Sequence, residues 1–147
     1  MAISDEVLAV LRAQLAGQAD EHARRWDQLG PAARLDYRAL VLAAFCRAAD
    51  RRFAPAAPAA EVAAYVSEVR TRSARGAEML DPRTAERLIR AVYTDEDTAD
   101  IDAATSYRTE ILMLGALTAD ARLDDAELDE FLGGARRTAD QWLAARN

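Results

Sequence analysis

The sequence predicts an all-α fold, a single-domain bundle of about six helices that takes in residues 1–147. Apolar residues recur at spacings of three and four, and no stretch alternates apolar with polar residues as a half-buried strand would. Alanine, the strongest helix former, fills 35 positions, whereas only four prolines and six glycines interrupt the chain. A length of 147 residues is typical of one domain and is enough to bury a sizeable core.

The first helix is expected to begin at Ser4, a good N-cap residue, and to end at Gly30, with Gly17 as a weak or bent point. Its apolar seam comprises Leu8, Leu11, Leu15, Ala19, His22, Trp26 and Leu29. The second helix, about 31–52, opens with a proline at its first position and holds the longest apolar run, the eight residues 39–46. Because this run has no polar face, we expect it to be the central helix of the core.

Three further helices follow from apolar residues at helical spacing and from their capping residues. One spans about 59–73, the next begins at Asp81 with a proline behind it, and the third spans about 101–119. An acidic loop at 94–100 precedes the third of these.

The sixth helix has the strongest local signal in the chain. Asp124 is expected as its N-cap and Glu127 as the N3 residue of a capping box, with Leu123 and Leu128 at the two positions of a hydrophobic staple. Gly133-Gly134 marks a candidate kink.

Two segments, 49–66 and 119–132, share one pattern: the end of an apolar helix, a turn with aspartate, an apolar residue, and a helix that opens with glutamate. The pattern favours a repeated helical-hairpin unit, but any two well-capped hairpins would look alike. The second copy resembles the joint between helices in the tellurite-resistance TerB-like helical domains. The resemblance covers fourteen residues, lacks the glycine usual in that turn, and implies no functional residue.

Composition excludes several classes of protein. No apolar run approaches the ~20 residues of a bilayer span, and no basic start precedes an apolar signal segment, so we expect a cytoplasmic protein without membrane contact. All 19 basic residues are arginine, which with the many alanines favours a bacterial chain from a GC-rich genome. A net charge of −6 gives no electrostatic reason to bind nucleic acid.

Residues that carry chemistry are few. One cysteine and one histidine exclude an internal disulfide and paired-histidine metal motifs. The spacing of an EF-hand fails from Asp95 and also from Asp120, and the chain has no glycine-rich phosphate loop. We therefore predict no catalytic residue, no cofactor and no metal ligand, and an enzyme is the less favoured reading.

Charge is the most specific functional signal. Residues 1–75 carry a net charge of +2, whereas 95–130 hold twelve acids against two arginines, a net charge of −10. We therefore expect an interaction module, such as an adaptor, an inhibitor or an immunity-type protein, that presents an acidic surface to a basic protein partner. The candidate partner-binding residues are Asp95, Asp97, Asp100, Asp102, Asp125, Asp129 and Glu130. A solvated face that binds nothing is the simpler alternative.

A second class of function stays open: a small-molecule-binding or enzymatic bundle with a pocket near His22, Trp26 and Cys46. The two helices that carry His22 and Cys46 follow one another, so their side chains could meet, although a packed histidine and an inert buried thiol are the commoner outcomes. A cluster of arginines at 47, 51 and 52 would suit an anion, or would pair with acids of the same chain.

Overall fold

In the computed structural model, which describes residues 2–146, the chain forms eight helices and no β-strand within those residues. The all-α prediction is confirmed, and the prediction of six helices is wrong by two. The helices are α1 (Asp5–Leu15), α2 (Ala19–Asp27), α3 (Pro31–Phe53), α4 (Ala59–Thr71), α5 (Ala74–Met79), α6 (Pro82–Ala91), α7 (Ala103–Ala121) and α8 (Asp125–Ala145). Within the described residues, no helix combines the length and the apolar character that a membrane crossing requires.

The first additional helix comes from a break in the predicted first one. Gly17 adopts a φ of +75°, a left-handed conformation that ends α1 and lets α2 fold back beside it. The predicted seam is interrupted at this break, where Ala19 is exposed, and resumes beyond it, where His22 and Trp26 are half-buried and Leu29 is buried. The second additional helix is α5, which is only six residues long and begins after Ser73, whose side chain accepts a hydrogen bond from the backbone of Gly76.

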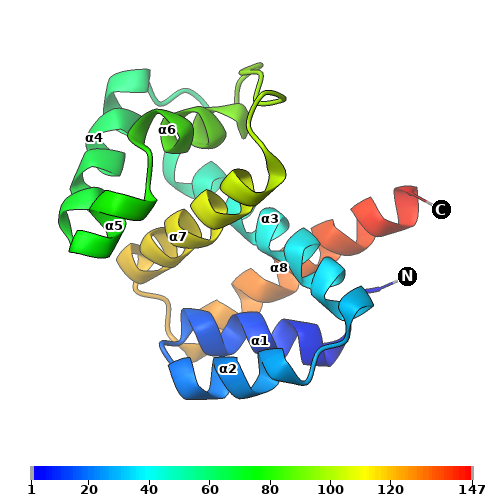
Figure 1. The fold of residues 1–147 in the computed structure, drawn as a ribbon. Coiled ribbons are helices and arrows are strands. Elements are labelled where there is room, and N and C mark those ends of the chain that lie inside the picture. The colour runs from blue at the N-terminus through cyan, green and yellow to red at the C-terminus, as the bar shows by residue number, and fades with distance from the viewer. Residues whose placement is uncertain (1, 147) are drawn as a thin grey trace.

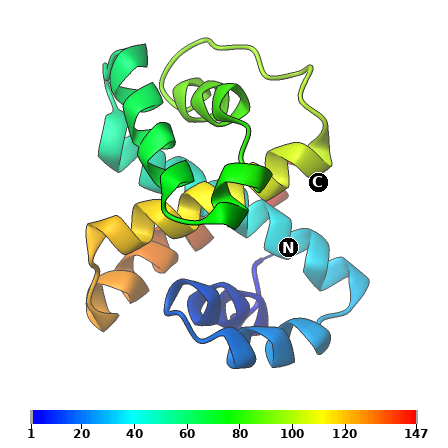
Figure 2. The same cartoon turned by 60° about the vertical axis from the view of Figure 1, so that its left-hand side comes forward.

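The helices form three groups (Figure 1). The long helices α3, α7 and α8 cross one another in the middle, with α1 and α2 on one side and α4, α5 and α6 on the other; the second view shows the same order (Figure 2). The prediction of a central second helix is confirmed: α3 supplies nine buried residues, among them Tyr37, Leu40 and Phe45. The central helices are thus packed on two sides, by α1 against α3, α7 and α8 and by α6 against α7.

Local signals place the helix ends well. Asp124 caps α8, and the capping box with Glu127 is complete in both directions, at 2.8 and 3.0 Å. Asp81 caps α6 with Pro82 behind it, as predicted. Between 101 and 119 the prediction began early, because Asp102 is the N-cap of α7.

The turn between α7 and α8 contains an unusual backbone conformation. Arg122 has φ 51° and ψ 49°, the left-handed region that glycine normally occupies at the end of a helix.

The apolar positions of the two similar segments agree in part. Tyr65 and Phe131, Val66 and Leu132, and Val62 and Leu128 are matched pairs, and all six side chains are buried. Nearer the turns the pairs differ, since Ala49 and Phe53 are buried whereas Ala119 is exposed and Leu123 half-buried. The connections also differ, since five residues separate α3 from α4 and three separate α7 from α8. The internal repeat stays a prediction.

Candidate functional site

Five of the seven predicted partner-binding acids already have partners in the same chain. Four form ion pairs with arginine, and one caps a helix. Asp100 accepts two hydrogen bonds from Arg87, at 2.9 and 2.6 Å, and this pairing lowers its pKa to about 2. Arg12 lies 2.7 Å from Asp129. The remaining contacts are Asp125 with Arg12 at 3.7 Å, Glu130 with Arg47 and Arg51 at 3.0 and 3.1 Å, and Asp102 as the N-cap of α7.

The other two predicted acids lie in the loop before α7. The Asp97 carboxylate accepts a hydrogen bond from the backbone of Ala99, 2.9 Å away, which stabilises the turn. Asp95 is exposed, and within residues 2–146 its side chain has no hydrogen bond or ion pair. Of the seven, Asp95 is the carboxylate most available to a partner.

Arginines from other parts of the chain compensate much of the charge of 95–130. Within the described residues, six of them lie within 4.0 Å of an acid in that stretch: Arg12, Arg47, Arg51, Arg72, Arg87 and Arg90. The net charge of −10 in the sequence is thus spread over pairs, and the surface formed by 95–130 is less acidic than its composition indicates.

Of the residues of the alternative pocket, His22 and Trp26 both lie beside the Tyr37 ring, whereas Cys46 lies farther along α3. The Nδ1 atom of His22 lies 2.9 Å from the carbonyl oxygen of Val10, and the ring centroids of Trp26 and Tyr37 are 5.2 Å apart in an edge-on arrangement. Cys46 lies nine positions, ~13.5 Å of helix, beyond Tyr37 in α3. Burial and nearby carboxylates raise the pKa of the Cys46 thiol to about 11, so the thiolate is scarce near neutral pH.

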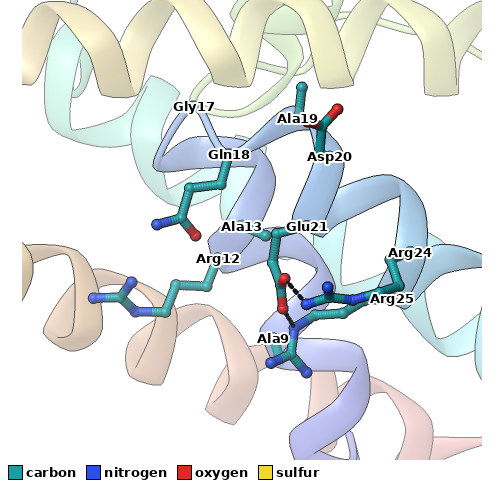
Figure 3. A pocket seen from close by; sticks show the side chains of 10 residues that line it. All are labelled: Ala9, Arg12, Ala13, Gly17, Gln18, Ala19, Asp20, Glu21, Arg24 and Arg25. Atoms are coloured by element: carbon teal, nitrogen blue, oxygen red, sulfur yellow. Dashed lines mark hydrogen bonds and ion pairs between the residues drawn. The ribbon is translucent and has the colours of Figure 1, made fainter.

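A large hollow lies on the surface between α1 and α2 (Figure 3), with a volume of about 810 Å³. It is open and polar. Most of its charged groups pair: Glu21 contacts both Arg24 and Arg25, the latter at 2.6 Å, and Arg12 extends away toward α8, whereas Asp20 is exposed to water. Since these charges are paired or solvated, size alone does not make this hollow a binding site.

A second surface combines apolar side chains with polar groups that have few partners. On the outer face of α3, Leu35 is 67% exposed and Leu42 is 36% exposed. Two adjoining hollows of about 330 and 400 Å³ lie beside them and share Leu35, Arg38 and Tyr107. We call this region the α3 groove; its principal residues are Leu35, Arg38, Leu42, Tyr107, Glu110 and Arg146.

Glu110 is the most unusual group in the α3 groove. Its side chain lines the groove, only 8% of the residue is exposed, and within residues 2–146 it has no hydrogen bond or ion pair. Burial raises its pKa to about 7, opposed in part by the positive charge of Arg38. A buried carboxyl without a partner destabilises the fold when it ionises, unless a bound group satisfies it.

Two arginines of this surface form no ion pair with a carboxylate of the described residues. The guanidinium of Arg34 lies 4.6 Å from the Trp26 ring centroid, and that of Arg38 lies 4.8 Å from the Tyr107 ring centroid. Neither forms an ion pair with any described residue, and the Nε of Arg34 is buried without a hydrogen-bond partner. Both cations are therefore positioned by aromatic rings and stay available to an anion.

Of this surface the sequence indicated only Trp26, as part of a pocket with His22 and Cys46, although a signal for the rest was present. The run 39–46 lacks a polar face, which indicated burial on all sides. A helix that is apolar all round can also leave one apolar side uncovered, and only the packing of α1, α7 and α8 shows that this side holds Leu35 and Leu42. Within residues 2–146, no cluster of three or more histidine, cysteine or acidic side chains could hold a metal ion.

Comparison with known proteins adds no family to these observations. No protein-family model matches the chain, and searches of curated proteins and of solved structures found no similar protein. None of these comparisons supports the resemblance of 119–132 to the TerB-like domains.

Proposed function

We propose that this protein is a non-enzymatic interaction module that binds an amphipathic helix of a partner protein in the α3 groove. The observation that carries the proposal is the exposure of Leu35, 67% of which is accessible, on the same face as Leu42 and beside two hollows. Exposed apolar groups next to a concave surface are typical of protein-binding sites.

The spacing of the two leucines suits a helical ligand. They are seven positions, ~10.5 Å of helix, apart, so a partner helix with apolar residues at i, i+3 or i+4, and i+7 would contact both. Full burial of a leucine side chain contributes about 1.5–3 kcal/mol, which makes the pair a plausible centre for a binding surface.

Charge determines which kind of helix fits. Arg34 and Arg38 flank the leucines and have no carboxylate among the described residues. A partner helix with acidic residues beside its apolar positions would supply those carboxylates. Protonation of Glu110, whose pKa is about 7, would reduce its repulsion of such a helix.

The prediction of a basic partner for the acids of 95–130 remains a second candidate. Its support is the net charge of that stretch in the sequence and the free side chain of Asp95. The pairs with six arginines weaken it, because a basic partner would have to displace those arginines or accept a reduced field.

Two synthetic peptides distinguish these surfaces. Both place leucines at i, i+4 and i+7 of an amphipathic helix; one carries glutamates beside them and the other lysines. We expect the acidic peptide to bind more tightly in isothermal titration calorimetry, and we expect its affinity to fall as salt rises from about 50 to 500 mM.

Three variants test the assignment. Leu35→Ser should abolish binding of the acidic peptide, whereas Met79→Ala, which truncates a 36% exposed apolar residue on α5, should leave it unchanged. The opposite result would favour the acidic surface of 95–130 over the α3 groove. In that case only the basic peptide would bind, and its binding would be lost when Asp95, Asp97, Asp100 and Asp102 are changed to arginine. Analytical ultracentrifugation of the protein without peptide shows whether a second copy of the chain occupies the groove. A dimer that dissociates in the Leu35→Ser variant would contradict the proposal of a different partner protein.

A further inference from the structure

A smaller and more enclosed cavity lies on the side of the central layer that faces α4. It has a volume of about 190 Å³ and is lined by α3, α4, α7 and the start of α8. Its walls come from both segments of the candidate repeat: Arg51, Arg52 and Tyr65 from 49–66, and Asp120, Leu123 and Phe131 from 119–132. We call it the joint cavity, because the ends of the two helical hairpins meet there.

The floor of the joint cavity is apolar. Ala48, Leu117 and Phe131 are each 7% exposed or less, and Leu123 is half-buried beside them. The hydroxyl of Thr118 donates to the carbonyl oxygen of Leu114, 2.8 Å away, so it does not present a free polar group to the cavity. An apolar group of a ligand would therefore find an apolar environment.

The only acid that lines the cavity is already satisfied. Asp120 receives two hydrogen bonds from Arg72, at 3.0 and 2.9 Å, and one from the Tyr65 hydroxyl, at 2.7 Å. These contacts lower the pKa of Asp120, so it stays ionised and paired at neutral pH. The positive charge of Arg52 also contributes to this lowering, although Arg52 forms no ion pair with Asp120 among the described residues.

The two arginines that line the cavity differ in their partners. Arg51 pairs with Glu130 at 3.1 Å. Arg52 forms no ion pair within the described residues; its guanidinium lies 5.0 Å from the ring centroid of Phe53 and 5.4 Å from that of Tyr65. Aromatic contacts hold this guanidinium at the cavity mouth, where it is near the charge of Asp120 but donates to no carboxylate of the described residues.

We infer that the joint cavity binds a small apolar monocarboxylate, with the apolar group between Leu117, Leu123 and Phe131 and the carboxylate on Arg52. A planar guanidinium offers two parallel donors to a carboxylate, which favours this headgroup over a hydroxyl or an amide. The volume corresponds to roughly six water molecules at ~30 Å³ each, so the apolar part is limited to about a phenyl ring or a short alkyl chain.

Two sources supply this chemistry: a free carboxylic acid, and the C-terminal residue of a peptide when that residue is apolar. Both present an apolar group and one carboxylate. The inference is independent of the proposed function, because the joint cavity and the α3 groove share no lining residue.

The direct test is titration of the full chain with 3-phenylpropionate, followed by backbone amide NMR. We expect saturable shifts at Thr118, Ala121 and Leu123, and much weaker effects from 3-phenylpropanamide, which lacks the charge, and from acetate, which lacks the ring. Acetylated peptides that end in phenylalanine, with a free or an amidated C-terminus, show which source the cavity accepts. Equal affinity for acid and amide would overturn the inference.

Two variants examine the assigned residues. Arg52→Gln should weaken 3-phenylpropionate binding about tenfold or more, whereas Arg75→Gln, an exposed arginine on α5, should have no effect. Ala121→Phe places a ring at the cavity from an exposed position and should block binding without disturbing the core. Unchanged affinity in either Arg52→Gln or Ala121→Phe would contradict the inference, and Leu35→Ser should bind the acid as well as the unmodified chain does.

Discussion

The guanidinium of Arg87 donates two hydrogen bonds to the carboxylate of Asp100, at 2.9 and 2.6 Å, from a position thirteen residues earlier in the chain. Arg87 lies on α6 and Asp100 in the acidic loop before α7. A further hydrogen bond from Arg87 to the Asp97 carbonyl oxygen, at 2.5 Å, ties the same loop to α6. One arginine thus organises a loop whose composition indicates a free acidic surface.

This contact predicts a shifted titration of Asp100. Its pKa, about 2, should rise toward the usual value of ~3.9 in an Arg87→Gln variant, and NMR of the side-chain carboxyl carbon measures the change. Because folding lowers this pKa, the pair stabilises the protein above pH ~4, and that contribution is lost as the pH falls toward 2. Arg75→Gln is the matched control, and an equal shift in both variants would contradict the assignment.

The charge pattern illustrates what a sequence can and cannot predict. The excess of acids in 95–130 is a property of the sequence, whereas their pairing depends on contacts between distant positions. Arg12 and Asp129 are 117 positions apart and meet only because α1 packs on α8. The number of charges was therefore predictable, and the amount of uncompensated charge was not.

Features that depend on neighbouring residues were predictable. The capping box of α8 joins positions three apart, so its residues identify it without knowledge of the fold. The split between α1 and α2 depends on how the chain turns at Gly17, which the sequence indicated only as a weak point. The α3 groove depends on which side of an apolar helix its neighbours leave uncovered, and no local pattern encodes that.

The N-cap of α8 predicts a measurable loss on mutation. Asp124→Ala removes the acceptor of the Glu127 backbone hydrogen bond, at 2.8 Å, and should reduce the free energy of unfolding by about 0.5–2 kcal/mol. Urea denaturation measures the change. Asp124→Asn retains a capping oxygen and should recover most of the stability; if alanine and asparagine lowered the midpoint equally, the cap would not be the cause.

The left-handed residue in the α7–α8 turn predicts a stabilising substitution. Arg122 has φ 51° and is exposed, so Arg122→Gly relieves backbone strain without removing a buried contact. Removal of the backbone strain should stabilise the folded state by ~1–2 kcal/mol. Because glycine has more conformational entropy in the unfolded chain, the net increase in the free energy of unfolding should be about 0.5–1 kcal/mol.

Gly17 also has a left-handed backbone conformation, and there the informative substitution is the reverse one, from glycine to a residue with a side chain. Gly17→Ala, at φ 75°, should destabilise the protein although a Cβ there meets no atom within 4 Å. Thermal denaturation of both variants measures the two effects, and a gain in stability from Gly17→Ala would show that the backbone readily changes its conformation there.

The glycine pair in α8 predicts two different responses to alanine. At Gly133 a Cβ would lie 3.6 Å from Arg137 Nη1, so Gly133→Ala should stabilise the helix by about 0.5–1 kcal/mol. At Gly134 a Cβ would collide with the Arg47 guanidinium, which packs across the helix on its way to Glu130. Gly134→Ala should therefore gain less, or lose stability.

A double-mutant cycle separates helix propensity from the collision at Gly134. In an Arg47→Ala background the obstacle is absent, so Gly134→Ala should show the full gain seen at Gly133. Urea denaturation of the four chains provides the coupling free energy. A coupling near zero would mean that Arg47 moves aside freely.

The buried carboxyl of Glu110 predicts how stability depends on pH. In the folded protein its pKa is about 7, whereas in the unfolded chain it should be near 4.3, so the folded state binds the proton more tightly. By linkage, the free energy of unfolding should fall as the pH rises from about 4.5 to 7, by roughly 2–4 kcal/mol from this group alone. The groups that face it are Arg38 and Cys46 on α3 and Tyr107 on its own helix.

The Glu110→Gln variant isolates that effect. Glutamine keeps the shape of the protonated side chain and cannot ionise, so the variant should match the unmodified protein near pH 4 and should be the more stable of the two at pH 8. Urea denaturation at both pH values gives the difference, and Glu61→Gln, at an exposed position, is the control. An acidic peptide in the α3 groove should stabilise the neutral form of Glu110. When that peptide is bound, the free energy of unfolding should therefore fall more steeply between pH 5 and 8. A difference between the variant and the unmodified protein that is the same at both pH values would show that Glu110 does not titrate in this range.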